Sequence, residues 1–451
     1  MRIKCSKYVS RFLVVLGAVL ITLSGQTTAS AISLIRDTEI ENTIRVYSQP
    51  IFEAAGLETG DIQIHIVNDP SLNAFVAGGQ RLFINTGLLM KAENAGQVIG
   101  VIAHETGHIS GGHLVRLQES LKNNTAKTIL TLVLGGIAAV ATGQGEAAGA
   151  VVAGGATLQQ RSLLSYTRTM EQSADQAAAL FLDEAGYSGR GLLQFLITLS
   201  GQELLSAGRQ DPYLRSHPLT RDRIEFMRNH VATSRHSDTP LRKDLVEAND
   251  RMRAKLKGFI NPPSRTLREY KADDTSFSAR YARAVAFKKQ FKIDEALALL
   301  DGLIVESPND PFLYELKGDV LQDAGRVADS IPPYEKAVQM LPWAALIRVS
   351  LAQSQLELKD RRSSDAALEN LQQAVRYEPE MPLLWRLLAT AHARNDDQAH
   401  VMLSLAEEAL LRGKKSEARQ RSKRAMDLLP ESTAGWIRAQ DIHQAAKKKK
   451  K

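Results

Sequence analysis

The sequence has almost no cysteine. Its only cysteine is Cys5, which lies in an N-terminal segment that we expect to be removed from the mature chain. The mature chain can therefore form no disulfide and offers no thiol nucleophile. Any metal ion must be held by histidine or carboxylate side chains.

The chain also lacks an excess of one charge outside its two ends. The formal net charge is +7, but nine of the 57 basic residues lie within residues 1–11 and in the lysine run 447–451. The other 48 basic residues stand against 50 acidic ones, which leaves no electrostatic footprint for a nucleic acid. We expect no nucleic-acid partner, and we expect the basic tail 447–451 to be a solvated end.

Long apolar runs are missing as well. The run 12–23 is shorter than the roughly 20 residues that span a bilayer. It follows a basic stretch and precedes the small residues 29–31, which is the pattern of a secretory signal peptide at residues 1–31. The Gly/Ala/Val-rich stretch 128–157 predicts buried or loosely packed helices. The alternative for this stretch is a mobile apolar flap that touches a membrane surface or an unfolded client.

Residues 32–258 carry both helix and strand signals, which predict a mainly helical α+β domain with a small sheet. Apolar residues recur at helical spacing over 39–55 and alternate at period two over 62–67. The segment 73–85 has a glycine pair between two short apolar runs and predicts a hairpin. A strongly apolar helix is predicted over 97–117.

The C-terminal half shows a repeat. A polar, proline-containing linker is predicted at 259–276, and beyond it Pro308 and Pro342 are 34 residues apart, which is the tetratricopeptide period. The spacings to Pro379 and then Pro430 are 37 and 51, so the last repeat is degenerate or extended. We expect three to four tetratricopeptide-like repeats over 277–446, forming an α-solenoid. The residues expected at the packing seam of the clearest repeat are Tyr314, Gly318, Ala328, Tyr334 and Ala337.

The predicted apolar helix contains the sequence His104-Glu105-Thr106-Gly107-His108. Residues four apart on a helix lie about 40° apart around its axis, so both imidazoles can bind one zinc ion. Glu105 could take a proton from a water on that metal and pass it to the leaving amine. The motif therefore predicts one zinc per chain and metal-assisted hydrolysis of an amide bond.

The third ligand must come from elsewhere in the chain. A metzincin pattern would place histidine at position 114, but that position is Leu114 and the nearby histidine is His113. Glu171 and Asp175 lie four apart on a predicted helix over 165–182, so they share one face. One of them could bind zinc while the other orients an imidazole. Spacing alone does not choose between the two.

The combined pattern resembles a known family. The sequence HExxHxxxxH, then ExxAD on a later helix, then His-Pro with an arginine six residues on, resembles the gluzincin peptidases related to the CAAX prenyl protease. It is more similar to their soluble bacterial branch with tetratricopeptide repeats. The resemblance implies zinc bound by His104, His108 and Glu171, with Glu105 as the general base and Asp175 in support. In the repeat region, this resemblance is one of architecture only.

The segment 216–223 resembles the family's His-Pro segment, which lies close to the active site. His217 could stabilise the oxyanion, or it could cap the metal as a fourth ligand and keep the enzyme latent. Arg223 could anchor this loop or a substrate carboxylate. The alternative is an ordinary turn with an exposed histidine. The hairpin resembles a strand beside the cleft where an extended substrate pairs. Its candidate substrate-binding residues are Asn73, Phe75, Arg81, Phe83 and Asn85.

The resemblance implies a periplasmic zinc endopeptidase, peripheral at the outer membrane, that degrades misfolded or stalled envelope proteins. The repeats would recruit the client or the β-barrel assembly machinery. The alternative is a repeat-based chaperone or adaptor for outer-membrane protein assembly with latent protease activity. The chain lacks the prenyl protease's multiple membrane spans, which argues against a prenylated substrate. The remaining histidines show no ligand spacing and are expected to be structural or at the surface; they are His65, His230, His236, His392, His400 and His443.

Overall fold

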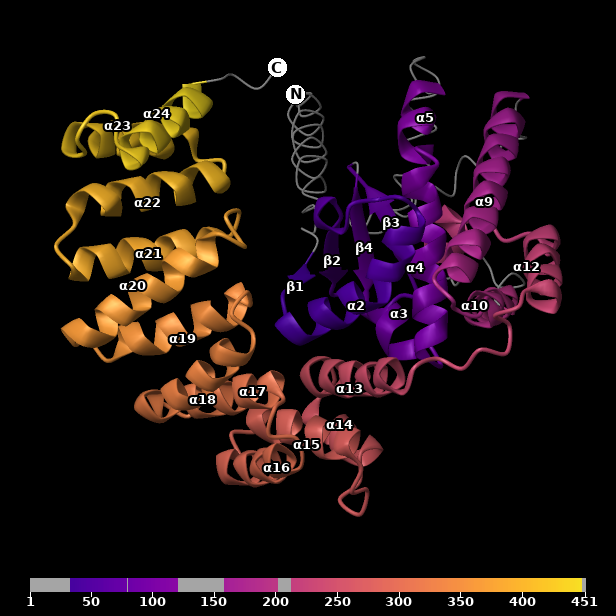
Figure 1. Cartoon of the computed structure of the whole chain (residues 1–451), viewed down its shortest axis with the longest axis horizontal. Coiled ribbons are helices and arrows are strands. Elements are labelled where there is room, and N and C mark those ends of the chain that lie inside the picture. The colour runs from indigo at the N-terminus through magenta and orange to yellow at the C-terminus, as the bar shows by residue number, and fades with distance from the viewer. Residues whose placement is uncertain (1–32, 79, 121–157, 202–211, 448–451) are drawn as a thin grey trace, which may run out of the picture. The chain divides into compact units, whose positions relative to one another are not determined.

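The computed structural model describes residues 33–78, 80–120, 158–201 and 212–447 (Figure 1). The chain divides into two compact units, the first formed mainly by Ile44–Val246 and the second by Glu247–Lys451 together with Arg36–Thr43. The predicted signal peptide, the apolar stretch 128–157 and residues 448–451 of the basic tail lie outside the described residues. Within the described ranges, no helix combines the length and the apolarity that crossing a membrane requires.

The first unit contains a four-stranded sheet in the order β1-β2-β4-β3. Strand β4 runs parallel to β2, and β3 runs antiparallel to β4 with Phe75 opposite Phe83, which confirms the predicted hairpin. Strand β3 is an edge strand, so one side of its backbone is unpaired within the described sheet. The strands are β1 (Leu34–Ile35), β2 (Gln63–Val67), β3 (Ala74–Ala77) and β4 (Arg81–Asn85).

Helices surround this sheet, as predicted for a mainly helical domain. Helix α2 (Thr38–Ala54) matches the periodic stretch 39–55 and buries Ile44, Tyr47 and Ile51 at helical spacing. The other helical elements of this unit are η1 (Thr59–Asp61), α3 (Thr86–Lys91), α4 (Ala95–Ser110), α5 (His113–Ser120), α9 (Leu158–Glu184), α10 (Arg190–Ser200), α11 (Pro212–Ser216) and α12 (Arg221–Thr233).

Helix α4 is the buried helix of the unit. Every residue from Gln97 to His108 is buried, and the Asn94 side chain caps the helix by accepting a hydrogen bond from the backbone N–H of Gln97. The prediction of one helix over 97–117 was wrong. Helix α4 ends at Ser110 because Gly112 adopts a φ of +59°, which a right-handed helix cannot continue. The chain therefore turns there before α5 begins.

Helix α9 packs along α4, as Figure 1 shows. The approach is close at Gly107, where an added Cβ atom would lie 2.7 Å from the backbone oxygen of Ala174. A larger residue at this position would push the two helices apart. The glycine inside the motif thus sets the separation of the two helices that carry the candidate ligands.

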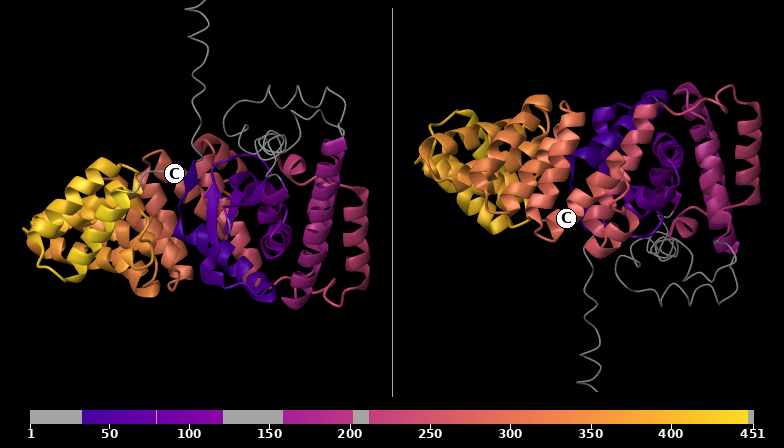
Figure 2. Two further views of the ribbon diagram at one scale, coloured as in Figure 1. Left: turned by 90° about the horizontal axis from the view of Figure 1, so that it is seen from above. Right: turned by 90° about the horizontal axis from the view of Figure 1, so that it is seen from below.

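The second unit is a stack of helix pairs, visible in Figures 1 and 2. Three helices, and not two, lie between Pro379 and Pro430, so the last predicted repeat is extended. The unit boundary falls after Val246, and the predicted linker 259–276 contains helix α14. The helices are α13 (Lys243–Ile260), α14 (Pro263–Glu269), α15 (Phe277–Lys289), α16 (Ile293–Glu306), α17 (Pro311–Asp323), α18 (Val327–Met340), α19 (Ala345–Glu357), α20 (Arg361–Val375), α21 (Pro382–Arg394), α22 (Gln398–Leu411), α23 (Lys415–Leu428) and α24 (Ala434–Lys447).

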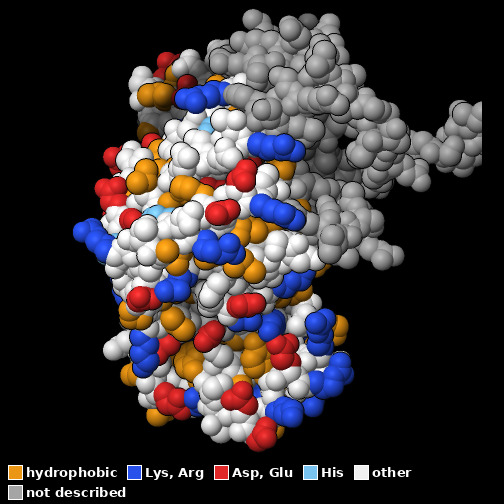
Figure 3. Space-filling model, turned by 90° about the vertical axis from the view of Figure 1, so that its right-hand side faces the viewer, with side chains coloured by type: hydrophobic (Ala, Val, Ile, Leu, Met, Phe, Trp, Pro, Cys, Tyr) orange, Lys and Arg blue, Asp and Glu red, His pale blue; other side chains and the backbone are white. Residues whose placement is uncertain are grey.

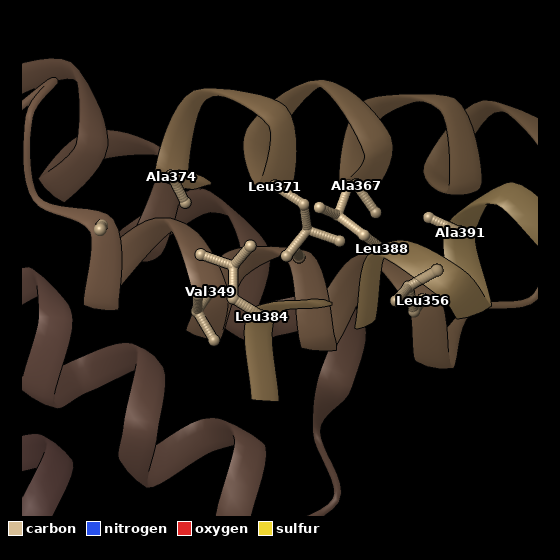
Figure 4. Close-up of a cluster of buried hydrophobic side chains, with 10 residues drawn as sticks. Val349, Leu356, Ala367, Leu371, Ala374, Leu384, Leu388 and Ala391 are labelled. Carbon is tan, nitrogen blue, oxygen red and sulfur yellow. The ribbon is translucent and has the colours of Figure 1, made fainter. Parts of the chain in front are cut away.

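Apolar side chains between successive pairs hold this stack together. Figure 4 shows one such cluster, in which Leu371 of α20 lies among Val349 of α19 and Leu384 and Leu388 of α21. Each of these side chains is at least 95% buried, so every repeat depends on its neighbours for its core. This arrangement confirms the predicted solenoid of helical repeats.

The predicted packing seam is correct for most of its residues. Gly318 lies against the ring of Tyr334, where an added Cβ atom would come within 2.6 Å of the ring, and Ala337 is buried. The prediction for Ala328 was wrong, because this residue is exposed. Ser330 takes the buried position and its hydroxyl hydrogen-bonds that of Ser354 at 2.9 Å.

Candidate metal centre

Four side chains from three parts of the first unit meet at one buried point. His104 and His108 come from α4, Glu171 comes from α9, and His217 follows α11. Each offers one ligand atom, and these atoms all lie within 4.8 Å of one another. All four side chains are buried. The structure therefore brings together the three ligands that the family resemblance implied and the histidine of the His-Pro segment.

The spacing of the first three residues suits a small tetrahedral ion. The Nε2 atoms of His104 and His108 are 3.1 Å apart, and each lies 3.3 Å from an oxygen of Glu171. A zinc ion with tetrahedral bonds to nitrogen and oxygen would separate its ligand atoms by about 3.3 Å. Two imidazoles and one carboxylate are also a donor set that zinc prefers. The residues present fit the metal.

Glu105 lies beside this set, with its Oε1 atom 3.4 Å from Nε2 of His217. Its side chain is fully buried, and neither carboxylate oxygen has a hydrogen-bond partner among the described residues. Burial raises the pKa of this carboxyl above its usual value, against the opposing effect of His217 and His104. A buried carboxylate with free acceptor positions is rare unless water or substrate reaches it. Among the described residues, both oxygens of Glu105 are therefore left able to accept a hydrogen bond.

The structure separates Glu171 from Asp175, which spacing could not do. The oxygens of Glu171 face the Nε2 atoms of both motif histidines, whereas Asp175 faces the opposite nitrogen, Nδ1, of His104 at 2.9 Å. A carboxylate at Nδ1 fixes the ring orientation and leaves Nε2 free to bind a metal. Glu171 is therefore the acid that faces the two Nε2 atoms, and Asp175 is the acid that contacts the far side of the His104 ring.

Arg223 ties this arrangement to the His-Pro segment. Its guanidinium donates to both oxygens of Asp175 and, at 3.1 Å, to the backbone carbonyl of Pro218. The Arg223 side chain is 1% exposed, and its Nη1 is also 3.0 Å from an oxygen of Glu171. Because the guanidinium is already enclosed by these partners, the geometry favours the loop-anchoring alternative over binding of a substrate carboxylate.

His217 is buried, so the alternative of an exposed histidine in an ordinary turn was wrong. Its Nδ1 atom lies 3.2 Å from both oxygens of Glu171 and 3.4 Å from Nε2 of His104. The ring of Tyr213 stacks on the imidazole, with centroids 4.4 Å apart. His217 therefore faces both the ligand atoms and the Glu105 carboxylate, and an aromatic neighbour holds it there.

The two motif histidines have different electrostatic surroundings. Burial would lower the pKa of His104, but hydrogen bonds with Asp175 and Glu171 outweigh it and raise the pKa to about 9. Burial lowers the pKa of His108 to about 3, and the nearby Glu171 only partly opposes this effect. His108 is therefore neutral at pH 7 and has a lone pair to offer a metal, whereas His104 must lose a proton to bind one.

His113 is a contact that the sequence reasoning did not assign. Its Nδ1 atom lies 3.0 Å from Nδ1 of His108, the nitrogen that points away from the ligand set. The turn at Gly111 and Gly112 makes this possible, because an added Cβ atom at Gly111 would lie 2.5 Å from the His113 ring. The available signal was the histidine five residues after His108, separated from it by a glycine pair.

The five candidate substrate-binding residues lie on or beside strands β3 and β4. Phe75 and Phe83 stack with ring centroids 4.9 Å apart, and His65 of β2 continues the stack on Phe83. Asn73 and Asn85 are buried, and each has a side-chain oxygen without a hydrogen-bond partner among the described residues. Arg81 is exposed at the start of β4. Since β3 packs against α4, this edge lies beside the helix that carries the motif.

The described residues on the face shown in Figure 3 form no region of a single charge. Figure 3 shows acidic and basic side chains interspersed on the face that it presents, among scattered apolar ones. This agrees, for the described residues on that face, with the near balance of charges in the sequence.

Comparison with known proteins adds a family to this geometry. The sequence model described as "Peptidase family M48" matches residues 35–231, which include every residue of the metal centre. A β-barrel assembly-enhancing protease from Yersinia pestis is 24% identical over 396 residues, covering 87% of this chain and 80% of the relative. The protein of that name from Escherichia coli strain K12 is 23% identical over 392 residues, covering 85% and 78%. The metalloprotease YcaL of the same strain is 26% identical over 176 residues, covering 38% and 63%.

These matches confirm the resemblance inferred from the motifs. They also confirm that the catalytic part of the chain is a metalloprotease domain. The matches to two of the three relatives extend over both compact units.

Proposed function

Because residues 35–231 form a domain of peptidase family M48, we propose that the chain is a zinc endopeptidase of the bacterial periplasm. Its clients would be misfolded or stalled outer-membrane proteins. The observation that carries the proposal is the buried set of His104, His108 and Glu171, beside which the Glu105 carboxylate makes no hydrogen bond with the described residues. Burying a carboxylate whose oxygens make no hydrogen bond is costly, and a role in proton transfer accounts for that cost.

His104, His108 and Glu171 would hold the zinc. When bound, zinc acts as a Lewis acid that polarises the scissile carbonyl and makes a water molecule acidic enough to lose a proton near neutral pH. Glu105 accepts that proton on a carboxylate oxygen and then donates it to the leaving amine nitrogen. Asp175 and Arg223 keep the His104 ring oriented during this exchange.

We infer that His217 makes the resting enzyme latent. Its Nδ1 atom is within 3.4 Å of ligand atoms on both His104 and Glu171, which supports the role of a fourth ligand. A histidine in that position occupies the place that water or substrate needs. For hydrolysis to begin, the His-Pro segment must withdraw this imidazole. The same imidazole could then face the oxyanion, which was the other role suggested by the sequence.

The edge strand β3 gives a physical reason for preferring unfolded clients. A substrate that pairs with the free edge of β3 must supply an extended segment whose own backbone groups are unpaired. A completed β-barrel has all its strands paired and offers no such segment. A stalled or misfolded barrel does offer an extended segment with unpaired backbone groups. The candidate residues Phe75 and Phe83 would lie against the side chains of that segment.

The helical repeats would select the client. Relatives covering most of this chain carry the name β-barrel assembly-enhancing protease. We therefore propose that the repeats bind the outer-membrane assembly machinery or its clients, and that the protein works peripherally at the outer membrane. The alternative is a chaperone or adaptor role carried by the repeats while the protease stays latent.

The proposal is tested with one β-barrel protein in two states. In the first it is unfolded, after dilution from urea into buffer, and in the second it is folded in detergent micelles. Zinc-loaded wild-type chain should cut the unfolded form and leave the folded form intact. A Glu105→Gln variant should cut neither but should still bind the unfolded form. If wild type binds the unfolded form and cuts nothing, with zinc present, the adaptor alternative replaces the protease. If both states are cut equally, the proposed selectivity is wrong.

A further inference from the structure

A second cluster of histidine and carboxylate side chains lies in the repeats, away from the catalytic centre in sequence. His392 is in the last turn of α21, Asp397 precedes α22, and His400 is in its first turn. The Oδ2 atom of Asp397 lies 3.1 Å from Nδ1 of His392 and 2.7 Å from Nδ1 of His400. The two imidazole rings stack, with centroids 5.0 Å apart.

The distance from Asp397 to His392 resembles those of the catalytic set, whereas Asp397 and His400 are at hydrogen-bond distance. In the catalytic set the ligand atoms are 3.1 to 3.3 Å apart, and here the two measured pairs are 3.1 and 2.7 Å apart. All three atoms of the second cluster fall within 4.8 Å of one another. Sequence spacing alone did not reveal this cluster, because the two histidines stand eight residues apart on different helices.

One atom of the cluster has no ordinary partner. His392 is 8% exposed, and its Nδ1 atom makes no hydrogen bond with acceptable geometry among the described residues, although Asp397 Oδ2 is 3.1 Å away. A buried polar atom without a hydrogen bond is costly, and a cation between this nitrogen and the carboxylate would satisfy both groups.

Helix capping does not account for the cluster. Asp397 caps α22 with its other oxygen, Oδ1, which accepts from the backbone N–H of His400 at 3.1 Å. In the preceding repeat Asp360 caps α20 in the same way, accepting from the N–H of Ser363 at 2.9 Å. The described contacts of Asp360 include no histidine. The cap therefore needs only one carboxylate oxygen, and the two imidazoles at Oδ2 are an addition specific to this repeat.

We propose that His392, Asp397 and His400 form a second metal site, which binds a zinc-class divalent cation and clamps α21 to α22. Two imidazoles with one carboxylate favour zinc and its transition-metal neighbours over magnesium or calcium, which prefer oxygen ligands. The side chain of His400 is 42% exposed, which leaves room for water as a fourth ligand. The chain then binds two zinc ions and not the one that the catalytic motif predicted.

The role of this second site is structural. The metal would tie the last turn of one repeat helix to the first turn of the next, across the turn that contains Asp396 with its left-handed φ of 57°. Metal binding to the folded chain adds to the stability of that helix pair. It does not require catalysis, so this proposal stands or falls independently of the protease activity.

The test counts zinc ions after equilibrium dialysis of the full chain and elemental analysis. Wild type should hold two ions per chain, His104→Ala/His108→Ala one, and His392→Ala/His400→Ala one. A His443→Ala variant should still hold two, because His443 belongs to the same unit but lies outside the cluster. Zinc should also raise the thermal unfolding midpoint of His104→Ala/His108→Ala, and this rise should vanish when His392 and His400 are replaced as well.

The single variant His400→Gln tests the same site with less risk of misfolding than the double variants, because the His400 side chain is partly exposed. In the His104→Ala/His108→Ala background it should weaken zinc binding at least about tenfold while the circular dichroism stays unchanged. One zinc per wild-type chain would overturn the proposal. So would a second zinc that remains in His392→Ala/His400→Ala, or zinc binding that His400→Gln leaves unchanged.

Discussion

The Arg223 guanidinium donates hydrogen bonds to both oxygens of Asp175, at 2.6 and 2.9 Å, and Asp175 in turn contacts Nδ1 of His104 at 2.9 Å. The guanidinium also holds the carbonyl of Pro218, the residue after His217. One buried chain of contacts therefore connects the His-Pro segment to the first motif histidine. A change at Arg223 should affect both the fold and the metal centre, although this side chain is not one of the ligands.

Replacing Arg223 with methionine should destabilise the first unit strongly. The variant leaves the Asp175 carboxylate buried without its cation, which typically costs about 3–5 kcal/mol. Urea unfolding followed by circular dichroism measures the effect. Arg221→Met is the matched control, because Arg221 is an exposed arginine on the same helix and its loss should change the unfolding midpoint little. Equal effects of the two variants would show that the buried contacts of Arg223 are not important for stability.

Removing the imidazole of His113 should weaken zinc binding at the catalytic centre. In His113→Phe the ring volume remains but the nitrogen that meets Nδ1 of His108 is lost. Loss of a group that orients a metal-binding histidine typically lowers affinity about 10- to 100-fold. Competition with a chelator measures this affinity. His113→Gln, which restores a hydrogen-bond acceptor, should recover part of it, and a variant His443→Phe should show no change.

His217→Ala should raise the rate of peptide cleavage, because the variant removes an imidazole that lies within 3.4 Å of ligand atoms on His104 and Glu171. Cleavage of a fluorogenic peptide at saturating zinc measures the rate. His230→Ala controls for loss of a histidine elsewhere in the same unit. A fall in the rate of about 100-fold would instead assign His217 to stabilising the oxyanion, and the latency proposal would be wrong.

Acid should weaken the second unit through Glu39. Burial would raise the pKa of Glu39, but Arg251 and Lys255 outweigh it and, with a hydrogen bond from Tyr281, lower the pKa below 4.5. A lowered folded-state pKa means that the carboxylate stabilises the fold above pH 4.5 and that this contribution is lost as the pH falls through the folded-state pKa. The midpoint of unfolding should therefore fall as the pH is lowered below 4.5.

A Glu39→Gln variant isolates that contribution. It should be less stable than wild type at pH 7 by about 3–5 kcal/mol, because Arg251 and Lys255 lose a buried partner. The difference from wild type should shrink as the pH falls below 4.5. Glu295→Gln removes an exposed acid of α16 and should follow the wild-type curve. A difference that stays constant with pH would refute the assignment to Glu39.

The sequence predicted the local features of the catalytic centre well. The spacing of His104 and His108 predicted that they share one helix face. They do so in the structure because both lie on one regular helix. The hairpin that contains Phe75 and Phe83 was predictable for the same reason, since alternation and a glycine pair act locally. The 34-residue period likewise reports a local helix-turn-helix unit.

The features that the sequence could not supply depend on tertiary contacts. The choice between Glu171 and Asp175 needed the approach of α9 to α4, and both residues occupy the same helix face. The contact of His113 with His108 depends on a left-handed residue at Gly112, which ends a helix that periodicity alone would continue. The meeting of His392 with His400 depends on how one helix pair closes, and no motif encodes that closure.

The central claim is that Glu105 transfers the proton in a zinc-dependent cleavage of peptide bonds. The most direct test measures zinc content and casein cleavage of wild type, Glu105→Gln and the control Glu184→Gln, which changes an exposed acid at the end of α9. Glu105→Gln should hold as much zinc as wild type and cleave about 10²- to 10⁴-fold more slowly, and Glu184→Gln should match wild type in both. Cleavage by Glu105→Gln at the wild-type rate, or cleavage that persists after chelation of all zinc, would contradict the account.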